Sequence, residues 1–258
     1  MFFALGALLQ LVALVSAQTV YLAGDSTMAK NGAGSGTGTD GWGQALGQYL
    51  NIPVVNQAVG GESARSFSDH GRFTTLVNSV QKGDFAIIEF GHNDVNSGSV
   101  DNGKQDAVGD GYSITSTVTN ASGQQLLIHS FAYYIENAIN PIKAKGGIPI
   151  ISSVTPDNLW TNGKMTGGGR FVTYAQSIGR NESIIYVNVN HNAYTVQAFN
   201  ALGETTVNTF YPNDHLHTSP AGANVVAQAF VRGLLCSNTS TLIPHVNSAG
   251  QKVPNGCL

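Results

Sequence analysis

The sequence predicts an α/β protein whose parallel β-sheet is covered by helices on both faces, and three observations support this prediction. Short apolar runs rich in Val and Ile recur along the chain, as in strands that are buried on both faces. Helix-like segments alternate with these runs, which is the order that a parallel sheet requires. No internal repeat and no Pro-rich linker interrupts the 258 residues, so we expect a single domain.

Five strands are expected, at residues 19–23, 53–56, 85–90, 148–153 and 184–189. Helices are expected at residues 42–50, 130–145, 171–180 and 191–202, and from residue 220 to about residue 235. Pro141 should kink or divide the second helix, which Gly146 and Gly147 should end. Ser219 and Pro220 are typical of the N-cap and the first position of the last helix.

The stretch from residue 93 to residue 125 is rich in Gly, Asn and Asp, and it is too long for an ordinary connection between elements. We expect a surface excursion there that contains a β-hairpin. Its strands are residues 112–118 and 124–128, and its turn is residues 120–123.

Composition and charge exclude several classes of function. The chain is 42% hydrophobic, which supports a packed core and excludes global disorder. Only 10% of the residues are charged and the net charge is -3, so we expect neither nucleic acid nor an anionic membrane surface as a partner. No His-Glu-x-x-His or Cys-x-x-Cys motif occurs, so no metal is expected. Residues 36–41 match a dinucleotide-binding fingerprint by letter, but they follow the first strand too distantly, and we expect no cofactor.

The N-terminal segment predicts export. Residues 1–17 are interpreted as a cleaved signal peptide, because an apolar run is followed by small residues; an uncleaved anchor or a buried helix is the alternative. The mature chain would be secreted, with no membrane contact after cleavage. Cys236 and Cys257 are the only cysteines, and we expect a disulfide between them, with two free thiols as the alternative. Sequons at Asn120, Asn181 and Asn238 are expected glycosylation sites.

Four polar clusters lie where loops should follow the strands or precede a helix. They are residues 24–27, 60–65, 91–94 and 214–217. An acyl-transfer site needs a nucleophile, a base, a group that orients the base, and donors for the oxyanion. Ser26 and Asn93 are candidates for the nucleophile and for one donor, although a turn or an N-cap explains either residue alone. Asp214 can orient a histidine of its own cluster, and spacing leaves both His215 and His217 as possible bases.

These blocks resemble those of the SGNH, or GDSL-type, hydrolases, and they occur in that family's order. The matching residues are Gly24-Asp25-Ser26, Gly61, Gly91-His92-Asn93-Asp94 and Asp214-x-x-His217. Longer strings, at residues 20–28, 63–66, 89–94 and 214–222, are similar to the fungal rhamnogalacturonan acetylesterases of carbohydrate esterase family 12.

The resemblance implies a three-layer α/β/α sandwich of the flavodoxin-like type with a five-stranded parallel sheet, forming one catalytic domain over residues 18–258. It implies Ser26 as nucleophile, His217 as general base and Asp214 as the residue that orients His217. The implied oxyanion hole combines the backbone N–H groups of Ser26 and Gly61 with the side-chain amide of Asn93.

The activity that the resemblance implies is that of a secreted serine esterase that removes acetyl groups from the rhamnogalacturonan backbone of pectin. Acetylated pectic polysaccharide is then the expected partner, and we expect a monomer without a cofactor. The alternatives are an acetylxylan or general polysaccharide acetylesterase, and a non-catalytic cell-wall polysaccharide-binding protein. Arg65 is a candidate to meet galacturonate carboxylates. Trp160 is a candidate to stack on a sugar ring, with core packing as its alternative.

Overall fold

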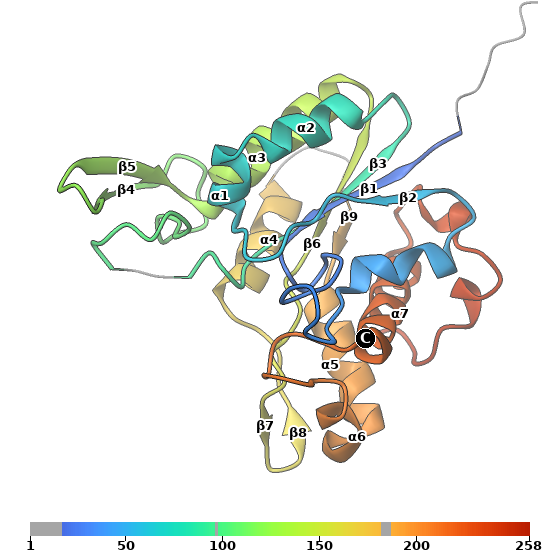
Figure 1. Cartoon of the computed structure of the whole chain (residues 1–258). Coiled ribbons are helices and arrows are strands. Elements are labelled where there is room, and N and C mark those ends of the chain that lie inside the picture. Colours follow the sequence, from blue (N-terminus) through green and yellow to red (C-terminus); the bar gives the residue numbers. More distant parts are fainter. Residues whose placement is uncertain (1–16, 96–97, 182–186) are drawn as a thin grey trace, which may run out of the picture.

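A five-stranded parallel sheet forms the centre of the computed structural model, which describes residues 17–95, 98–181 and 187–258 (Figure 1). The strands are β1 Val20–Gly24, β2 Val54–Asn56, β3 Phe85–Glu89, β6 Ile148–Ser152 and β9 Val187–Val189, in the spatial order β2-β1-β3-β6-β9. All neighbouring pairs are parallel. The five strands lie where the sequence predicts them, while residues 184–186 of the last predicted strand fall outside the described residues.

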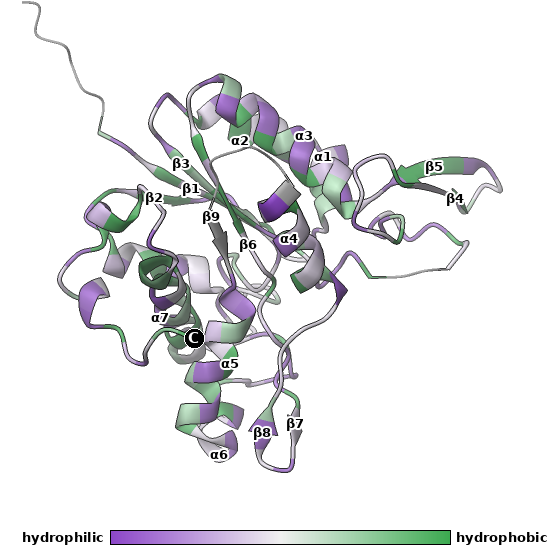
Figure 2. Cartoon of the chain, turned by 180° about the vertical axis from the view of Figure 1, so that it is seen from behind, coloured by the Kyte–Doolittle hydropathy of each residue, from purple (hydrophilic) through white to green (hydrophobic). Residues whose placement is uncertain are grey.

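Helices cover both faces of the sheet, so the predicted three-layer α/β/α architecture is confirmed. One face carries α1 Ala64–Asp69, α2 Arg72–Ser79, α3 Phe131–Ala144 and α4 Arg170–Asn181. The other face carries α5 His191–Leu202, α7 Pro220–Ser237 and two short 3-10 helices, Trp42–Gln44 and Leu46–Tyr49. In Figure 2 the strands are mostly hydrophobic, whereas the helices carry hydrophobic and hydrophilic residues side by side.

Alternation along the strands divides the core into two clusters. Phe85 and Ile87 point into the cluster on the α7 side, where Trp42 and Phe230 also lie, and Ala86 and Ile88 point into the cluster beneath α1 to α4. Because successive side chains of a strand face opposite sides, an apolar run without alternation is required to fill both clusters. Full burial of one such large apolar side chain stabilises the fold by about 1.5–3 kcal/mol.

Two helix predictions are corrected. Residues 42–50 form the two 3-10 helices rather than one α-helix, with close backbone packing at Gly43, where a β-carbon would lie 2.7 Å from Met28 O. α3 runs through Pro141 without division, because Pro141 lies in the last turn and removes only one internal hydrogen bond. The sequence analysis also missed α1, α2, α6 Glu204–Asn208 and the small hairpin of β7 Trp160–Thr161 and β8 Lys164–Met165.

The predicted surface excursion and disulfide are both present. β4 Thr115–Thr119 and β5 Gln125–His129 form the expected antiparallel hairpin, and its turn is closed by a hydrogen bond from Gly123 N to Asn120 O (3.0 Å). Cys236, near the end of α7, is bonded to Cys257. Asn238 is exposed directly after α7, and Asn120 lies at the hairpin turn. Asn181 is the last residue of α4. Glycosylation stays a prediction at all three.

The strand order creates a switch point between β1 and β3, because the chain first adds β2 on one side of β1 and then β3 on the other. Open α/β sheets bind ligands outside the carboxyl ends of their strands at such a point. No helix among the described residues is long and apolar enough to cross a membrane. The predicted signal peptide, residues 1–17, lies almost wholly outside the described residues.

Candidate active site

The four polar clusters meet at the switch point. Ser26 follows β1, Gly61 follows β2 and Asn93 follows β3, so all three lie beyond the carboxyl ends of adjacent strands. The segment from Asp214 to His217 directly precedes α7, which packs on the face of the sheet opposite α1 to α4. Residues separated by almost the whole chain are thereby brought within hydrogen-bonding distance.

A tight turn presents Ser26. Asp25 holds this turn, since its Oδ1 accepts hydrogen bonds from Thr27 N (2.9 Å) and Thr27 Oγ1 (2.8 Å), and its carbonyl accepts from Ala29 N (3.0 Å). Gly24 lets the turn begin, because a β-carbon there would lie 2.8 Å from Glu89 O. The backbone N–H of Ser26 donates to none of the described residues and remains available to a ligand.

Ser26, His217 and Asp214 form a hydrogen-bonded chain. Ser26 Oγ lies 2.8 Å from His217 Nε2, and His217 Nδ1 lies 2.7 Å from Asp214 Oδ2. A carboxylate can only accept hydrogen bonds, so Nδ1 carries the ring proton and Nε2 accepts from the Ser26 hydroxyl. The geometry meets the requirement of a nucleophile paired with an oriented base.

Asp214 is kept ionised by its own loop. Its Oδ1 accepts from Leu216 N (2.8 Å) and His217 N (2.7 Å), and its Oδ2 faces the His217 ring. Partial burial opposes ionisation, but hydrogen bonds from the His217 backbone, the His217 ring and Leu216 N outweigh it and lower the pKa of Asp214. The structure also separates the two histidines: His215 is exposed, and its carbonyl accepts from Asn158 N (2.7 Å).

The three predicted oxyanion donors lie together beside Ser26. A β-carbon on Gly60 would lie 3.8 Å from Ser26 Cβ, so the turn at Gly60 and Gly61 borders the serine. Gly61 has φ +78, a left-handed conformation that favours glycine, and its N–H donates to none of the described residues. Asn93 Nδ2 donates to Glu62 O (3.0 Å), which places the Asn93 amide against the same turn. Its second N–H is available to a ligand.

Buried carboxyl groups lie behind these donors. Asp94 is fully buried, its Oδ1 accepts from Ala64 N (2.7 Å), and the carboxyl of Asp106 is buried beside it. Burial raises the pKa of Asp94 to about 7, against the hydrogen bond from Ala64, and burial together with the Asp94 charge raises the pKa of Asp106. Two carboxyl groups buried side by side resist losing both protons, because like charges disfavour each other. Burial likewise raises the pKa of Asp25, with His92 and Thr27 opposing the shift.

The sequence analysis missed a buried polar network centred on Glu89 at the end of β3. Its carboxyl oxygens accept from Trp42 Nε1 (2.9 Å) and Ser152 Oγ (2.6 Å), and Oε2 lies 2.7 Å from His191 Nδ1. His191 Nε2 faces the Val226 carbonyl (2.8 Å), so the network joins the sheet to α5 and α7 beneath the active site. The only sign of this network in the sequence was an acidic residue, Glu89, within the apolar run at residues 85–90.

Arg65 and Trp160, the two residues predicted to contact substrate, lie in different surroundings. The Arg65 guanidinium is buried, and its Nη1 donates to Asp101 Oδ1 (2.8 Å) and to Gln105 O (3.3 Å). That geometry argues against direct contact between Arg65 and a substrate carboxylate. Trp160 is half-buried and donates from Nε1 to Asn158 Oδ1 (2.7 Å), beside the loop that carries His217. Its role in sugar stacking stays a prediction.

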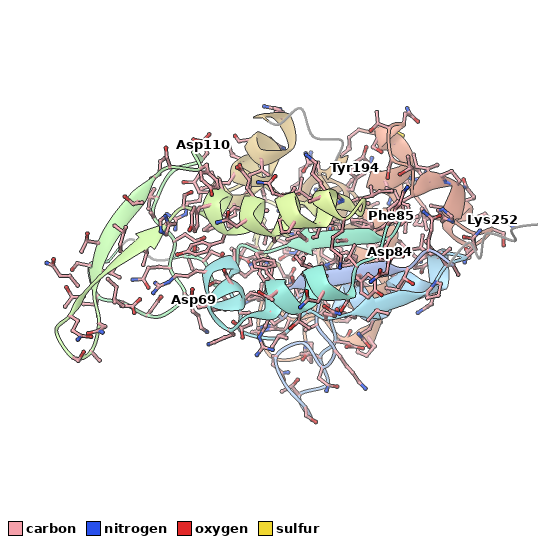
Figure 3. All side chains as sticks on the ribbon, turned by 90° about the horizontal axis from the view of Figure 1, so that it is seen from above. Asp69, Asp84, Phe85, Asp110, Tyr194 and Lys252 are labelled. Atoms are coloured by element: carbon pink, nitrogen blue, oxygen red, sulfur yellow. A yellow bond between two sulfur atoms is a disulfide. The ribbon has the colours of Figure 1, made fainter. Side chains whose placement is uncertain are left out.

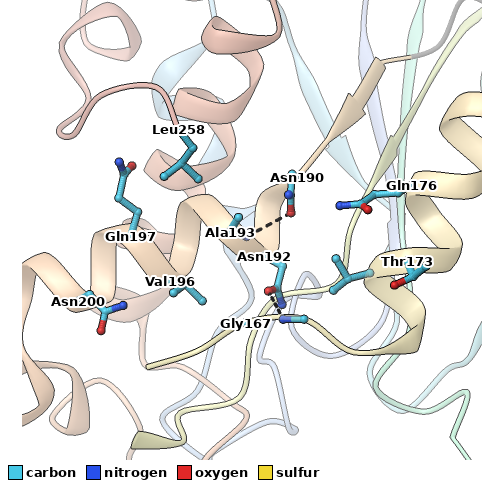
Figure 4. A pocket seen from close by; sticks show the side chains of 12 residues that line it. Gly167, Thr173, Gln176, Asn190, Asn192, Ala193, Val196, Gln197, Asn200 and Leu258 are labelled. Carbon is cyan, nitrogen blue, oxygen red and sulfur yellow. Dashed lines mark hydrogen bonds between the residues drawn. The ribbon is translucent and has the colours of Figure 1, made fainter. Parts of the chain in front are cut away.

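A separate hollow lies away from Ser26, Asp214 and His217. It has a volume of about 700 Å³ and lies between α4 and α5, lined by uncharged side chains such as Gln176, Asn192 and Asn200 (Figure 4). The residues predicted to act in catalysis do not line this hollow; they are Ser26, Gly61, Asn93, Asp214 and His217. Among the described residues no three His, Cys, Asp or Glu side chains are arranged to hold a metal ion.

Comparison with known proteins gives a consistent result. Residues 20–230 match the family described as GDSL-like lipase/acylhydrolase. The chain is 44% identical over 233 residues to a rhamnogalacturonan acetylesterase of Emericella nidulans, which covers 90% of this chain and 91% of that protein. It is 27% identical over 231 residues to the uncharacterized esterase YxiM of Bacillus subtilis, covering 85% of this chain and 52% of YxiM. The crystal structure of YxiM has the same fold, with a TM-score of 0.67 at 22% identity over 88% of this chain and 58% of that chain.

Proposed function

Because the chain belongs to the GDSL-like lipase/acylhydrolase family and is thereby a carboxylic ester hydrolase, we propose that it removes acetyl groups from the rhamnogalacturonan backbone of pectin. The observation that carries the chemistry is the hydrogen-bonded chain from Ser26 Oγ through His217 to Asp214. The substrate class is supported by the 44% identity to the Emericella nidulans rhamnogalacturonan acetylesterase.

In the first half-reaction His217 Nε2 takes the proton of Ser26 Oγ as the oxygen attacks the acetyl carbonyl. A tetrahedral intermediate forms, and its oxyanion is held by the backbone N–H groups of Ser26 and Gly61 and by the Asn93 amide. Asp214 stabilises the imidazolium that results. The bond to the sugar oxygen then breaks, and the sugar alcohol leaves with the proton from His217.

In the second half-reaction water hydrolyses the acetyl-serine. His217 removes a proton from the water as it attacks, and the same donors hold the second oxyanion. Collapse of this intermediate releases acetate, and the proton returns from His217 to Ser26. Each step uses only groups that lie at the carboxyl edge of the sheet.

The decisive experiment is acetate release by the purified protein from acetylated rhamnogalacturonan and acetylated xylan in parallel. Ser26→Ala removes the nucleophile while leaving the fold intact, and kcat should fall by about 10⁴- to 10⁶-fold. Release mainly from rhamnogalacturonan, and only by the unsubstituted protein, supports the proposal. Equal or faster release from xylan would retain the mechanism and reject the pectic substrate. Binding of polysaccharide without turnover would instead favour the non-catalytic function.

The protein is also proposed to act outside the cell. The disulfide between Cys236 and Cys257 is of a kind that persists in oxidising compartments. The apolar segment at residues 1–17 has the composition of a signal peptide. Detection of the mature protein in culture medium, with its N-terminus at residue 18, would test both points.

A further inference from the structure

A lysine ammonium lies against the turn at Gly60 and Gly61, hereafter called the oxyanion turn. A β-carbon placed on Gly61 would lie 3.8 Å from Lys104 Nζ, and the catalytic proposal uses the backbone N–H of that same glycine. Lys104 is half-buried, although Asn102 and Gly103 before it are exposed. The long side chain therefore lies along the protein surface toward the site instead of extending into solvent.

The backbone of Lys104 is held in place by its neighbours. Asn102 Oδ1 accepts from Lys104 N (2.8 Å) and from Gln105 N (2.8 Å), which closes a compact turn. The buried Arg65 then fastens this turn to α1, because it donates to both the Asp101 carboxylate and the Gln105 carbonyl. α1 begins three residues after Gly61, so the ammonium and the oxyanion turn belong to one connected unit.

The ammonium of Lys104 has no counter-charge of its own. Asp101, the acidic residue nearest to Lys104 in the chain apart from Asp106, is engaged by Arg65, and neither Asp94 nor Asp106 forms an ion pair with Lys104. No described residue forms an ion pair or hydrogen bond with Lys104 Nζ. An ammonium beside a reacting centre attracts an anion, and an uncompensated cation is poised to bind one from the substrate.

We propose that Lys104 Nζ binds a galacturonate carboxylate of the bound substrate and so makes the enzyme prefer acidic over neutral acetylated polysaccharides. This inference rests on the proposed function and adds the residue that distinguishes the substrate class. Rhamnogalacturonan carries a carboxylate on every galacturonate unit, whereas xylan esters offer a neutral backbone. Lys104 is a specificity residue here, since the acyl-transfer steps use other groups.

The test compares acetylated rhamnogalacturonan oligosaccharides with the same oligosaccharides after methyl esterification of their carboxyl groups. The unsubstituted protein should have a kcat/KM about tenfold higher for the charged form, the size expected of one hydrogen bond to a charged group. Lys104→Gln should abolish this preference, mainly through KM, whereas Lys104→Arg should retain most of it. Turnover of p-nitrophenyl acetate, a small ester without a carboxylate, should change by much less than the preference does in both variants.

Lys252→Gln is the matched control. Lys252 is exposed and lies at the end of the molecule where Phe85 begins β3, whereas Asp69 and Asp110 lie at the opposite end (Figure 3). This variant removes the same charge and should leave the preference unchanged. If Lys104→Gln keeps the preference, or slows p-nitrophenyl acetate hydrolysis equally, the inference is overturned. If the unsubstituted protein hydrolyses p-nitrophenyl acetate but releases no acetate from either oligosaccharide, the proposed function fails first, and the inference fails with it.

Discussion

Asp214 and the Asp94–Asp106 pair belong to the same site, yet the structure places them in opposite environments. The Asp214 side chain is 41% exposed and its pKa is lowered by hydrogen bonds to the charged form. Asp94 is fully buried, burial raises its pKa to about 7, and burial also raises the pKa of the neighbouring Asp106. The same kind of side chain is therefore an ion on one side of Ser26 and a largely neutral group on the other.

The difference shows how one residue type serves two purposes. A carboxylate that stays charged can stabilise an imidazolium, which is the role proposed for Asp214 beside His217. A carboxyl pair that keeps a proton can link segments without leaving a bare charge in the interior. Asp94 joins the loop that carries Asn93 to the start of α1 through Ala64 N, so the pair supports two of the oxyanion segments at once.

The largest effect is expected for Asp214→Asn. The carbonyl oxygen of the introduced amide can still accept from Leu216 N and His217 N, which directs its NH₂ group at His217 Nδ1. His217 must then accept at Nδ1 and carry its proton on Nε2, where it can no longer take one from Ser26. We expect kcat to fall by about 10³- to 10⁴-fold, measured as initial rates on p-nitrophenyl acetate.

Asp110→Asn is the control for that measurement, because Asp110 is exposed and lies on the excursion far from His217 in sequence. It should keep full activity. Retained activity in Asp214→Asn, with a melting temperature unchanged, would contradict the assigned role of Asp214.

An intermediate effect is expected for Asn93→Ala, which tests the buried side of the site. The change removes the amide donor and leaves the hydrogen bond from Ala64 N to Asp94 in place. We expect kcat to fall by about 10²- to 10³-fold, the loss typical of one oxyanion donor, with little change in KM. Steady-state kinetics on acetylated rhamnogalacturonan would check it, and a fall below threefold would remove Asn93 from the oxyanion hole.

The smallest effect on rate, and a distinct effect on stability, is expected for Asp106→Asn. In the folded chain the Asp94–Asp106 pair keeps a proton between pH 3.8 and about 7. An aspartate in the unfolded chain loses its proton over the same range. The pair therefore stabilises the fold most at the acid end of that range, and its contribution falls, by on the order of a few kcal/mol, as the pH rises toward 7. The amide introduced by Asp106→Asn would donate to Asp94 without a shared proton, so this slope should flatten while kcat stays within about tenfold of the original.

Urea unfolding at several pH values between 4 and 7 measures that slope directly. Asp110→Asn again serves as the control and should reproduce the original pH dependence. An identical slope in Asp106→Asn would show that the pair does not carry the pH dependence of stability.

Much of the fold and of the site was predictable because its signals are local. Each strand is an apolar run, and Ser26, Gly61 and Asn93 follow three of these runs directly. Parallel strands bring their carboxyl ends to one edge, so the order of the clusters along the chain was sufficient to group them. α1 and α2 were missed because residues 64–79 contain several serines and a glycine that interrupt the apolar positions. Residues 42–50 were predicted as one α-helix, and the structure forms two 3-10 helices there.

The remaining features depend on contacts between distant segments. Glu89 meets Trp42, 47 residues away, and His191, 102 residues away, and neither partner is marked by its neighbours in the chain. Arg65 was predicted to face substrate. Asp101, 36 residues later on the excursion, supplies the counter-charge that stabilises the buried guanidinium. Such contacts cannot be predicted from spacing along the sequence, because they depend on how the chain folds.

The separation of 191 residues between Ser26 and His217 has a consequence for biosynthesis. Synthesis reaches Ser26, the proposed nucleophile, 191 residues before it reaches His217, the proposed base. A nascent chain therefore carries its serine without the means to deprotonate it. On the proposed mechanism the site is complete only when the segment before α7 has folded against the sheet, so a nascent chain that has not reached His217 cannot hydrolyse an ester.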